Sequence, residues 1–304
     1  MNKSYAHAPY EKFYIRDPKV RPIHKSSVRD RVVHHAVFKV LNEIFEPSFI
    51  FDSYSCRINK GTHRAVLRLK KFSDAIYAEY SKCFVLKCDI KKFFHSIDHE
   101  ILLKLVWQKI KNDEIMRVVK ILIDSFRGNL IGERERERES KGCPIGNLTS
   151  QLFANIYLNE LDQFIKSTLK VRHYIRYTDD FVIAHHNPEY LLSIKEEIAQ
   201  FLNVNLKMEL HPSKVVLRKY HAGVDFLGYV LLPRAILLRT KTKRRMFKKV
   251  RKRILDYKRE VISEQQLMQT INSYLAVLSH ANSFKLRREL MHMIWTLLRS
   301  PEYF

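Results

Sequence analysis

The chain has 304 residues, 46% of them hydrophobic, which is enough to bury the core of one large domain or two modest ones. With only 7 Gly and 9 Pro, the composition excludes a fibrous or largely disordered protein. The formal net charge of +23 favours a polyanionic partner, above all a nucleic acid, because neutralised phosphates release condensed counterions.

The sequence indicates neither a membrane anchor nor a zinc site. No apolar run approaches the roughly 18 residues of a membrane-spanning helix, and the first residues lack an apolar core of signal-peptide length. The cysteines form no CxxC pair and no zinc-like spacing with histidine. We therefore expect free thiols, a reducing cytoplasm and no membrane partner.

Hydrophobic periodicity predicts alternating helices and strands, followed by a basic helical end. Apolar residues spaced three to four apart predict helices, and apolar or β-branched runs predict strands. In chain order these are a helix over 28–45, a strand over 84–90, a helix over 99–110, a helix after Gly146, a strand pair over 174–184, a helix over 188–202 and a strand region that ends at 225–229. Beyond Arg234 the composition becomes cationic and is typical of helices as far as Trp295.

Two further segments have an unusual composition. Residues 1–27 are polar and basic and contain several prolines. Residues 133–139, ERERERE, alternate strictly in sign, which separates the charges onto two faces if the segment is extended. We expect an exposed hairpin or loop tip at this place.

Three carboxylates stand out in this basic chain. Asp179 and Asp180 lie within the strand-like YIRYTDDFVIA, although Asp is depleted in strands, and alone the pair indicates a hairpin tip. Asp89 ends the apolar run FVLKC, where a carboxylate is costly unless it is paired or bound to a cation. If the two segments are neighbours in one sheet, the three side chains converge on a site for hard cations such as Mg²⁺. Two such ions promote phosphoryl transfer.

The motifs around these carboxylates resemble those of reverse transcriptase palms. They are Asp89-Ile-Lys-Lys-Phe-Phe, the turn Gly146–Gln151 and Tyr177-Thr-Asp-Asp, within a resemblance that runs from about Arg21 to Tyr229. The resemblance implies an α+β right-hand polymerase fold, with fingers and palm made of an antiparallel sheet plus helices, and a small helical thumb. We expect fingers over 1–86, a palm over 87–233 with a fingers insertion near 110–145, and a thumb over 234–304.

The same resemblance implies the activity of an RNA-directed DNA polymerase. Its cofactors would be two Mg²⁺ ions, with Mn²⁺ as a substitute, and its partners an RNA template, a DNA or RNA primer and dNTPs. The implied metal ligands are Asp89, Asp179, Asp180 and the carbonyl of Ile90. Lys214 matches a lysine that is proposed to protonate the leaving pyrophosphate in relatives. The implied primer grip consists of Phe226, Leu227, Gly228 and Tyr229.

A second group of residues is implied to bind the incoming nucleotide. Phe94, five residues after Asp89, matches the position beneath the sugar, where a bulky ring disfavours a 2′-OH; ordinary core packing is the alternative. Arg21 matches a fingers position that contacts the triphosphate, which suits a guanidinium fork. Gly146 permits a close backbone approach, and the helix that starts before Gln151 offers N–H groups to an anion.

Basic residues outside this site are candidates for binding nucleic-acid phosphates. The cationic run over 241–259 would ordinarily be a solvated helix face, but in a polymerase thumb it would grip the primer–template. The candidate contacts are Arg57, Lys241, Lys243, Arg244, Arg245, Lys248, Lys249 and Arg251.

The turn at Gly146 departs from the pattern Gln-Gly-x-x-x-Ser-Pro of retroviral and intron-encoded relatives. Its Ile145-Gly and Ser150-Gln ends resemble the reverse transcriptases of diversity-generating retroelements, as do four other segments. These are Arg29-Asp-Arg-Val-Val-His-His-Ala, Ser53-Tyr-Ser-Cys-Arg57, Lys60-Gly-Thr-His63 and Leu152-Phe-Ala-Asn-Ile-Tyr. Replacing an amide by Ile145 removes a polar check beside the nascent base pair, which predicts error-prone copying. The resemblance implies that this copying is mutagenic chiefly at template adenines.

This subtype implies a basic accessory protein oligomer as a further partner, in a prokaryote or phage. Thr178 departs from it, because a larger residue is common at the variable position of Tyr-x-Asp-Asp in diversity-generating examples. A defence-associated or otherwise unclassified bacterial reverse transcriptase is therefore the alternative. A non-catalytic RNA-binding relative of a polymerase is a third hypothesis, against which the three intact carboxylates speak.

Overall fold

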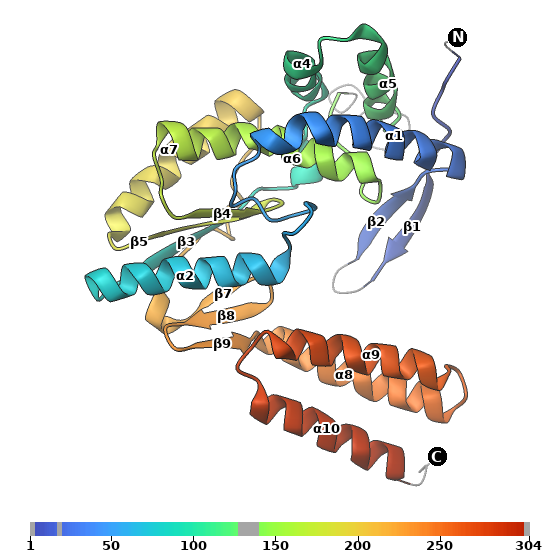
Figure 1. Cartoon of the computed structure of the whole chain (residues 1–304), viewed down its shortest axis with the longest axis vertical. Helices are drawn as coiled ribbons and strands as arrows, with labels where there is room; N and C mark the ends of the chain where they lie inside the picture. Colours follow the sequence, from blue (N-terminus) through green and yellow to red (C-terminus); the bar gives the residue numbers. More distant parts are fainter. Residues whose placement is uncertain (1–3, 17–19, 127–139, 301–304) are drawn as a thin grey trace. The chain divides into compact units, whose positions relative to one another are not determined.

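The computed structural model describes residues 4–16, 20–126 and 140–300 (Figure 1). The hairpin or loop tip predicted at 133–139 lies outside the described residues. The chain divides into two compact units, Met1–Gly61 with Leu86–Leu217, and Thr62–Val85 with Arg218–Phe304. It passes from one unit to the other between Gly61 and Thr62 and within the strands β3 (Phe84–Asp89) and β6 (Val216–Lys219).

The first unit begins with an antiparallel hairpin of β1 (Glu11–Ile15) and β2 (Arg21–Lys25). Its helices gather around one central helix, against which three of them pack. That helix is buried at most of its positions, which is typical of a helix surrounded by protein. The helices are α1 (Val28–Phe45), α4 (His99–Ile110), α5 (Asp113–Asp124), the central α6 (Leu148–Gln163) and α7 (Pro188–Leu206), with α1, α4 and α7 packing on α6.

A four-stranded sheet has the order β4–β5–β3–β6. The strands β4 (Tyr174–Tyr177) and β5 (Asp180–His185) form an antiparallel hairpin in which Tyr174 pairs with Ile183. Apolar side chains keep the middle of β5 buried, and α7 packs against this strand. Because β5 lies beside β3, the hairpin tip and the end of β3 belong to one part of the sheet.

The second unit combines α2 (Thr62–Tyr80), a small antiparallel sheet and three further helices. The sheet contains β7 (Val224–Phe226), β8 (Tyr229–Leu232) and β9 (Ala235–Leu238). The helices are α8 (Thr240–Lys258), α9 (Glu264–Ser279) and α10 (Phe284–Arg299). They bury one shared apolar cluster of Met246, Val250, Ile254, Leu267, Ile271, Leu278, Leu290 and Ile294.

Most of the predicted elements are confirmed, but β1, α2, α5 and β9 were missed. The predicted helices and strands correspond to α1, β3, α4, α6, the β4–β5 hairpin and α7. The predicted strand region was too short, because β8 and β9 extend it to Leu238 before the basic helix begins. The two compact units divide the chain at other residues than the predicted fingers, palm and thumb, so that subdomain assignment stays a prediction.

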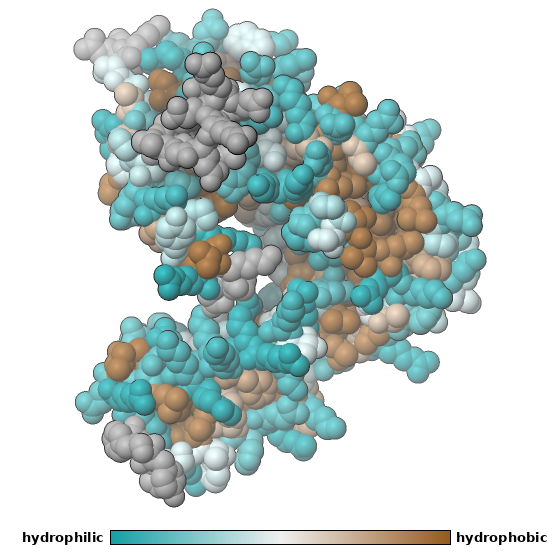
Figure 2. Space-filling model, turned by 180° about the vertical axis from the view of Figure 1, so that it is seen from behind, coloured by the Kyte–Doolittle hydropathy of each residue, from teal (hydrophilic) through white to brown (hydrophobic). Residues whose placement is uncertain are grey.

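No helix in the described ranges is both long and apolar enough to cross a membrane. Figure 2 shows a face on which hydrophilic residues predominate, with hydrophobic residues gathered in smaller patches. The cysteines Cys56, Cys83, Cys88 and Cys143 are free thiols, as predicted.

Candidate active site

The first part of the site is the end of strand β3, which carries Asp89. Asp89 is 9% exposed, and its carbonyl accepts a hydrogen bond from the N–H of His211 at 2.7 Å. Two residues on, the N–H of Lys91 donates to the carbonyl of Glu209 at 2.9 Å. These two bonds form an antiparallel bridge that holds the segment after α7 against the end of β3.

This bridge brings Lys214 to the carboxylate. Ile90 and Leu210 face each other in the bridge, but the bridging bonds use the backbone groups of the flanking residues rather than those of Ile90. The Lys214 ammonium donates to Oδ1 of Asp89 at 2.7 Å. The structure therefore places the predicted residues Asp89, Ile90 and Lys214 together.

The second part of the site is the tip of the β4–β5 hairpin. Tyr177 pairs with Asp180, so Thr178 and Asp179 form a two-residue loop. Thr178 has a φ of +55°, in the left-handed region. The loop places Asp179 at the tip and Asp180 at the first position of β5, the strand next to the one that ends at Asp89.

Electrostatic coupling shows that the three carboxylates share one site. The pKa of Asp179 is raised to about 6, mainly by burial and further by the charges of Asp180 and Asp89, while Lys214 opposes the rise. The pKa of Asp180 is also raised, mainly by burial, and the Asp89 carboxylate adds to this through its charge and a hydrogen bond. The Lys87 ammonium, 3.9 Å from Oδ1 of Asp180, opposes the rise.

The chemistry of this cluster fits divalent cations. Its donors are oxygens, which Mg²⁺ prefers, and a bound cation would offset both the burial and the repulsion that raise the two pKa values. Within the described residues, no group of three or more His, Cys, Asp or Glu side chains is already arranged to hold a metal ion. Lys214 instead holds one oxygen of Asp89, so metal binding requires this ammonium to move aside.

Phe94 lies on the short helix α3 (Phe93–Ser96) that follows β3. The chain turns into this helix through Lys92, which has a φ of +49°. Phe93 is buried, whereas Phe94 is only half-buried and its carbonyl accepts from the N–H of Cys143 at 2.7 Å. The core-packing role is thus taken by Phe93, and the sugar-sensing role of Phe94 stays a prediction.

Gly146 approaches a strand of its own chain. Its φ is +122°, and a Cβ at this position would lie 2.8 Å from Cγ2 of Ile23 in β2. Beside it, the N–H of His24 donates to the carbonyl of Ile145 at 2.9 Å. The predicted close neighbour of Gly146 was a ligand, but in the structure packing against β2 already requires glycine.

The same contact places the start of α6 beside the end of β2, the strand that begins with Arg21. Arg21 is the exposed first residue of β2, and Gln151 is exposed in the first turn of α6. Asn147, at the N-cap of α6, accepts a hydrogen bond from Ser26 and donates to the carbonyl of His24. It makes no side-chain cap on its own helix. The start of α6 thus lies at the end of β2, whereas Arg21 lies at its beginning, and all of these residues belong to the unit that holds the carboxylates.

The predicted primer grip is a tight hairpin between β7 and β8. Phe226 pairs with Tyr229, and both side chains are buried. Leu227 and Gly228 form the turn, with φ values of +48° and +90°. This hairpin belongs to the second unit.

The cationic face of α8 forms an open groove of about 780 Å³. All of the thumb candidates except Lys243 are exposed, and the Lys243 ammonium lies 3.1 Å from a carboxylate oxygen of Glu289. The groove is lined by Thr240, Lys243, Arg244, Phe247, Lys248, Arg251, Lys252 and Leu255.

Arg57, a predicted nucleic-acid contact, is used inside the protein. Its side chain is 7% exposed and pairs with Glu46 at 2.8 Å. The guanidinium also donates to the carbonyls of Ile50 and Ser53. In this structure Arg57 therefore fastens a loop, and little of its charge is left for a phosphate.

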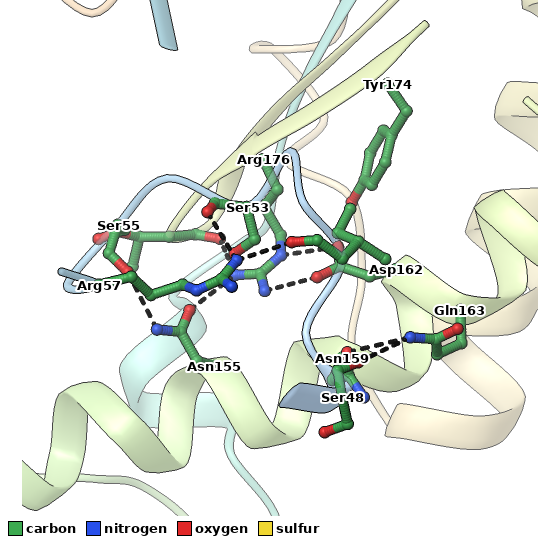
Figure 3. A network of polar contacts seen from close by, with 12 residues as sticks. Ser48, Ser53, Ser55, Arg57, Asn155, Asn159, Asp162, Gln163, Tyr174 and Arg176 are labelled. Carbon is green, nitrogen blue, oxygen red and sulfur yellow. Dashed lines mark hydrogen bonds and ion pairs between the residues drawn. The ribbon is translucent and has the colours of Figure 1, made fainter. Parts of the chain in front are cut away.

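Sequence reasoning missed two groups near the carboxylates. Lys87 has a sequence signal, because residues two apart on a strand share a face and Lys87 stands two before Asp89. The buried ion pair of Arg176 and Asp162 has no sequence signal, because Arg176 comes from β4 and Asp162 from α6 (Figure 3). Arg176 stands one residue before Tyr177, where the motif begins.

Residues 15–231 match the family model of reverse transcriptase (RNA-dependent DNA polymerase). Group II intron-encoded protein LtrA of Lactococcus lactis subsp. cremoris is 26% identical over 292 residues, which cover 74% of this chain and 47% of LtrA. Protein YkfC of Escherichia coli K12 is 27% identical over 263 residues, which cover 75% of this chain and 68% of YkfC. The chain thus spans about half the length of LtrA.

Among solved structures, telomerase from Candida tropicalis shares the fold. Its apo structure has a TM-score of 0.60 at 13% sequence identity and covers 98% of this chain and 63% of the telomerase chain. Its complex with a TWJ fragment of telomeric RNA also has a TM-score of 0.60, at 12% identity, and covers 98% of this chain and 56% of that one. The predicted α+β polymerase fold is confirmed.

Proposed function

The chain belongs to the reverse transcriptase (RNA-dependent DNA polymerase) family, and from this membership we propose that it extends a primer with deoxynucleotides copied from RNA. One observation carries the proposal. Asp89 and the pair Asp179 and Asp180, some 90 residues apart in sequence, are electrostatically coupled in one site. Such an oxygen cluster is suited to two-metal phosphoryl transfer.

In this proposal the carboxylates hold two divalent cations. Asp89, Asp179 and Asp180 supply side-chain oxygens, and the carbonyl of Ile90 supplies a backbone oxygen. When bound, Mg²⁺ ions would activate the primer 3′-hydroxyl and stabilise the leaving oxygen. Lys214, whose ammonium already contacts Asp89, then turns its proton toward the leaving pyrophosphate. Family membership and the chemistry of the donors support this arrangement.

The nucleotide is proposed to sit between β3, β2 and the turn at Gly146. Phe94, half-buried next to the fully buried Phe93, presents a ring without a hydrogen-bond acceptor to the 2′ position. Arg21 offers its exposed guanidinium to the triphosphate. Ile145, Gly146 and Gln151 line the neighbouring turn.

The nucleic acid is proposed to be held mainly by charge. The groove on α8 presents several cations together with Phe247 and Leu255, so it offers both phosphate contacts and an apolar surface. Outside the groove, α8 has three more exposed cations that could contact phosphates: Lys241, Arg245 and Lys249. The RNA-bound telomerase structure supports an RNA partner for the fold.

Primer extension tests this function. The purified chain is given an RNA template, an annealed DNA primer, Mg²⁺ and either dNTPs or rNTPs, with Asp180→Asn as the inactive variant and Asp113→Asn as its matched surface control. We expect extension with dNTPs by the wild type and by Asp113→Asn alone. Phe94→Ala should then admit rNTPs; absence of any extension by the wild type would favour the non-catalytic RNA-binding reading.

A narrower proposal is that copying is mutagenic, as in diversity-generating retroelements. It rests on Ile145, a hydrocarbon side chain in the turn where other relatives carry an amide, and on Gln151. Sequencing of cDNA from a defined RNA should then show errors concentrated at template adenines, which Ile145→Gln reduces. Errors spread evenly over the four bases would favour defence-associated or general copying. A basic accessory protein oligomer would be tested as a stimulator in the same assay.

A further inference from the structure

The loop residue Thr178 adopts a conformation that its own chemistry disfavours. Its φ of +55° is in the left-handed region, which costs an L-residue roughly 1–2 kcal/mol and is rarest for β-branched side chains. Two-residue hairpin loops usually place Gly, Asn or Asp at such positions. Other contacts must therefore hold Thr178, and with it the adjacent Asp179.

Two hydrogen bonds reach Thr178 from different elements. Its carbonyl accepts from Nη1 of Arg176 at 3.2 Å. Its hydroxyl donates to Oγ of Ser55 at 2.7 Å. The backbone and the side chain of the strained residue are thus each fixed by a separate partner.

Arg176 is itself held rigidly. Its Nε and Nη2 donate to the two carboxylate oxygens of Asp162 at 2.8 and 2.7 Å, and neither side chain is exposed. Nη1 also donates to Oδ1 of Asn155 at 3.2 Å. Figure 3 shows the guanidinium between Asp162 and Asn155, while the hydroxyl of Tyr174 donates to Asp162. Such a bidentate, charge-assisted fork fixes direction as well as distance.

The loop that carries Ser55 is fastened to the same strand. The N–H of Tyr54 donates to the carbonyl of Arg176 at 2.9 Å, and the N–H of Arg176 donates to the carbonyl of Asp52 at 3.0 Å. Asn155 donates to the carbonyl of Ser55 at 3.0 Å. Because Asn155 contacts both Arg176 and Ser55, the two supports of Thr178 form one connected network.

We propose that Arg176, Asp162 and Ser55 are positioning residues that hold Thr178 in the left-handed region and thereby aim the Asp179 carboxylate. The inference rests on the proposed polymerase function. A buried ion pair is weak evidence for stability, so a network of this kind is better explained by the geometry that it imposes. A small misplacement of a reacting group costs a large factor in rate.

The first test measures single-nucleotide incorporation by Ser55→Ala, Thr178→Val and the double variant. Each single change should lower kcat by about tenfold and leave the KM for dNTP within about twofold, since the loss falls on the reacting geometry. The double variant should be no slower than the slower single variant, because both remove the same bond. The kcat of Thr178→Gly should be higher than that of Thr178→Val, because glycine adopts a positive φ freely.

Ser125→Ala is the matched control for Ser55→Ala. It also removes a hydroxyl that hydrogen-bonds another hydroxyl, that of Tyr10, at 2.9 Å. We expect its kcat to stay at the wild-type value even if its melting temperature falls. Equal losses in kcat for Ser55→Ala and Ser125→Ala, or additive losses in the double variant, would overturn the positioning role.

The second test does not depend on activity. Amide hydrogen exchange of the segment 174–184 should become about fivefold faster in Ser55→Ala and Thr178→Val, as expected for the loss of one net hydrogen bond. It should not change in Ser125→Ala. An inactive wild type with this pattern would refute the polymerase function and leave the network standing. Unchanged exchange in both variants would refute the network, whatever the activity.

Discussion

Three hairpins in the described residues turn through two-residue loops, and two of them, β7–β8 and β4–β5, are held in different ways. In the β7–β8 hairpin the loop contains Gly228, at a φ of +90°, and the flanking Phe226 and Tyr229 are buried. In the β4–β5 hairpin the loop contains Thr178 and Asp179, with no glycine.

The difference separates two ways of stabilising a turn. The β7–β8 loop has glycine at only one of its two positive-φ positions, because Leu227 has a φ of +48°, and the buried residues on either side pack locally. The β4–β5 loop relies on a hydrogen bond that Arg176 donates to Thr178 and one that Thr178 donates to Ser55, while its carboxylates have raised pKa values because of burial and mutual repulsion. The second hairpin is therefore arranged for chemistry at some expense in stability.

The largest expected effect comes from comparing the same Asp→Asn change made separately in each hairpin. Asp179→Asn should lower primer extension by about a thousandfold or more, because it removes a charge proposed to bind both cations. Asp225→Asn in β7 removes an exposed salt bridge to Arg239 and should leave the rate within about threefold. A comparable loss of primer-extension rate in the two variants would show that the two hairpins do not differ in function.

The next effect concerns the support of the β4–β5 hairpin. Asp162→Asn leaves the fully buried Arg176 without its counter-charge, so we expect a loss of about 3–5 kcal/mol in the free energy of unfolding. Denaturant unfolding measures this change. A loss below about 1 kcal/mol, the size of a surface ion pair, would show that water or another group replaces the carboxylate.

A smaller effect of opposite sign is expected for Asp179→Asn. The pKa of Asp179 is raised from 3.8 to about 6, so the wild type loses stability as pH rises through this interval. In EDTA, the variant should match the wild type near pH 4 and exceed it by about 1–2 kcal/mol at pH 8, after allowance for partial exposure. Addition of Mg²⁺ should then stabilise the wild type alone.

Urea unfolding at several pH values measures this difference. If Asp179→Asn were less stable than the wild type at pH 8 in EDTA, neither burial nor the neighbouring carboxylates would disfavour the ionised Asp179 side chain in the folded state. The account of the cluster as a cation site would then lose its physical basis.

The smallest effects compare the two loops directly. Gly228→Ala places a Cβ at a φ of +90° with only an ordinary contact to Thr242, so it should cost about 1 kcal/mol through backbone strain. Thr178→Gly relieves a similar strain but loses the bond to Ser55, so its net change should stay within about 0.5 kcal/mol. Thermal unfolding of both variants tests this; a loss above 2 kcal/mol for Thr178→Gly would mean that the turn is not strained.

The sequence predicted the local features of the site well. Asp89 could be identified because it ends a buried strand, and Asp179 and Asp180 because they interrupt a strand-like segment. Hydrophobic periodicity predicted the helices around these carboxylates, because the buried face of a helix repeats every three to four residues. Lys87 could have been predicted as well, because it stands two residues before Asp89 on the same strand.

Features that depend on tertiary contacts could not be predicted. The partner of Arg176 is Asp162, which lies in a helix whose buried positions give no sign of which charge they face. Gly146 is required by Ile23, which stands 123 residues earlier. Arg57 was expected at the surface because it is cationic, yet Glu46 and two carbonyls use its charge. β9 was missed because four apolar residues are too few for a periodic signal.

The central claim is that two motifs distant in sequence form one catalytic centre. Single-turnover incorporation of one deoxynucleotide opposite an RNA template tests it most directly, with Asp89→Asn, Asp179→Asn and the double variant compared at equal concentration. The account predicts that each single variant loses about a thousandfold and that the double variant loses no more, because residues that act as a unit are not additive. An Asp89→Asn variant with the wild-type rate would contradict it.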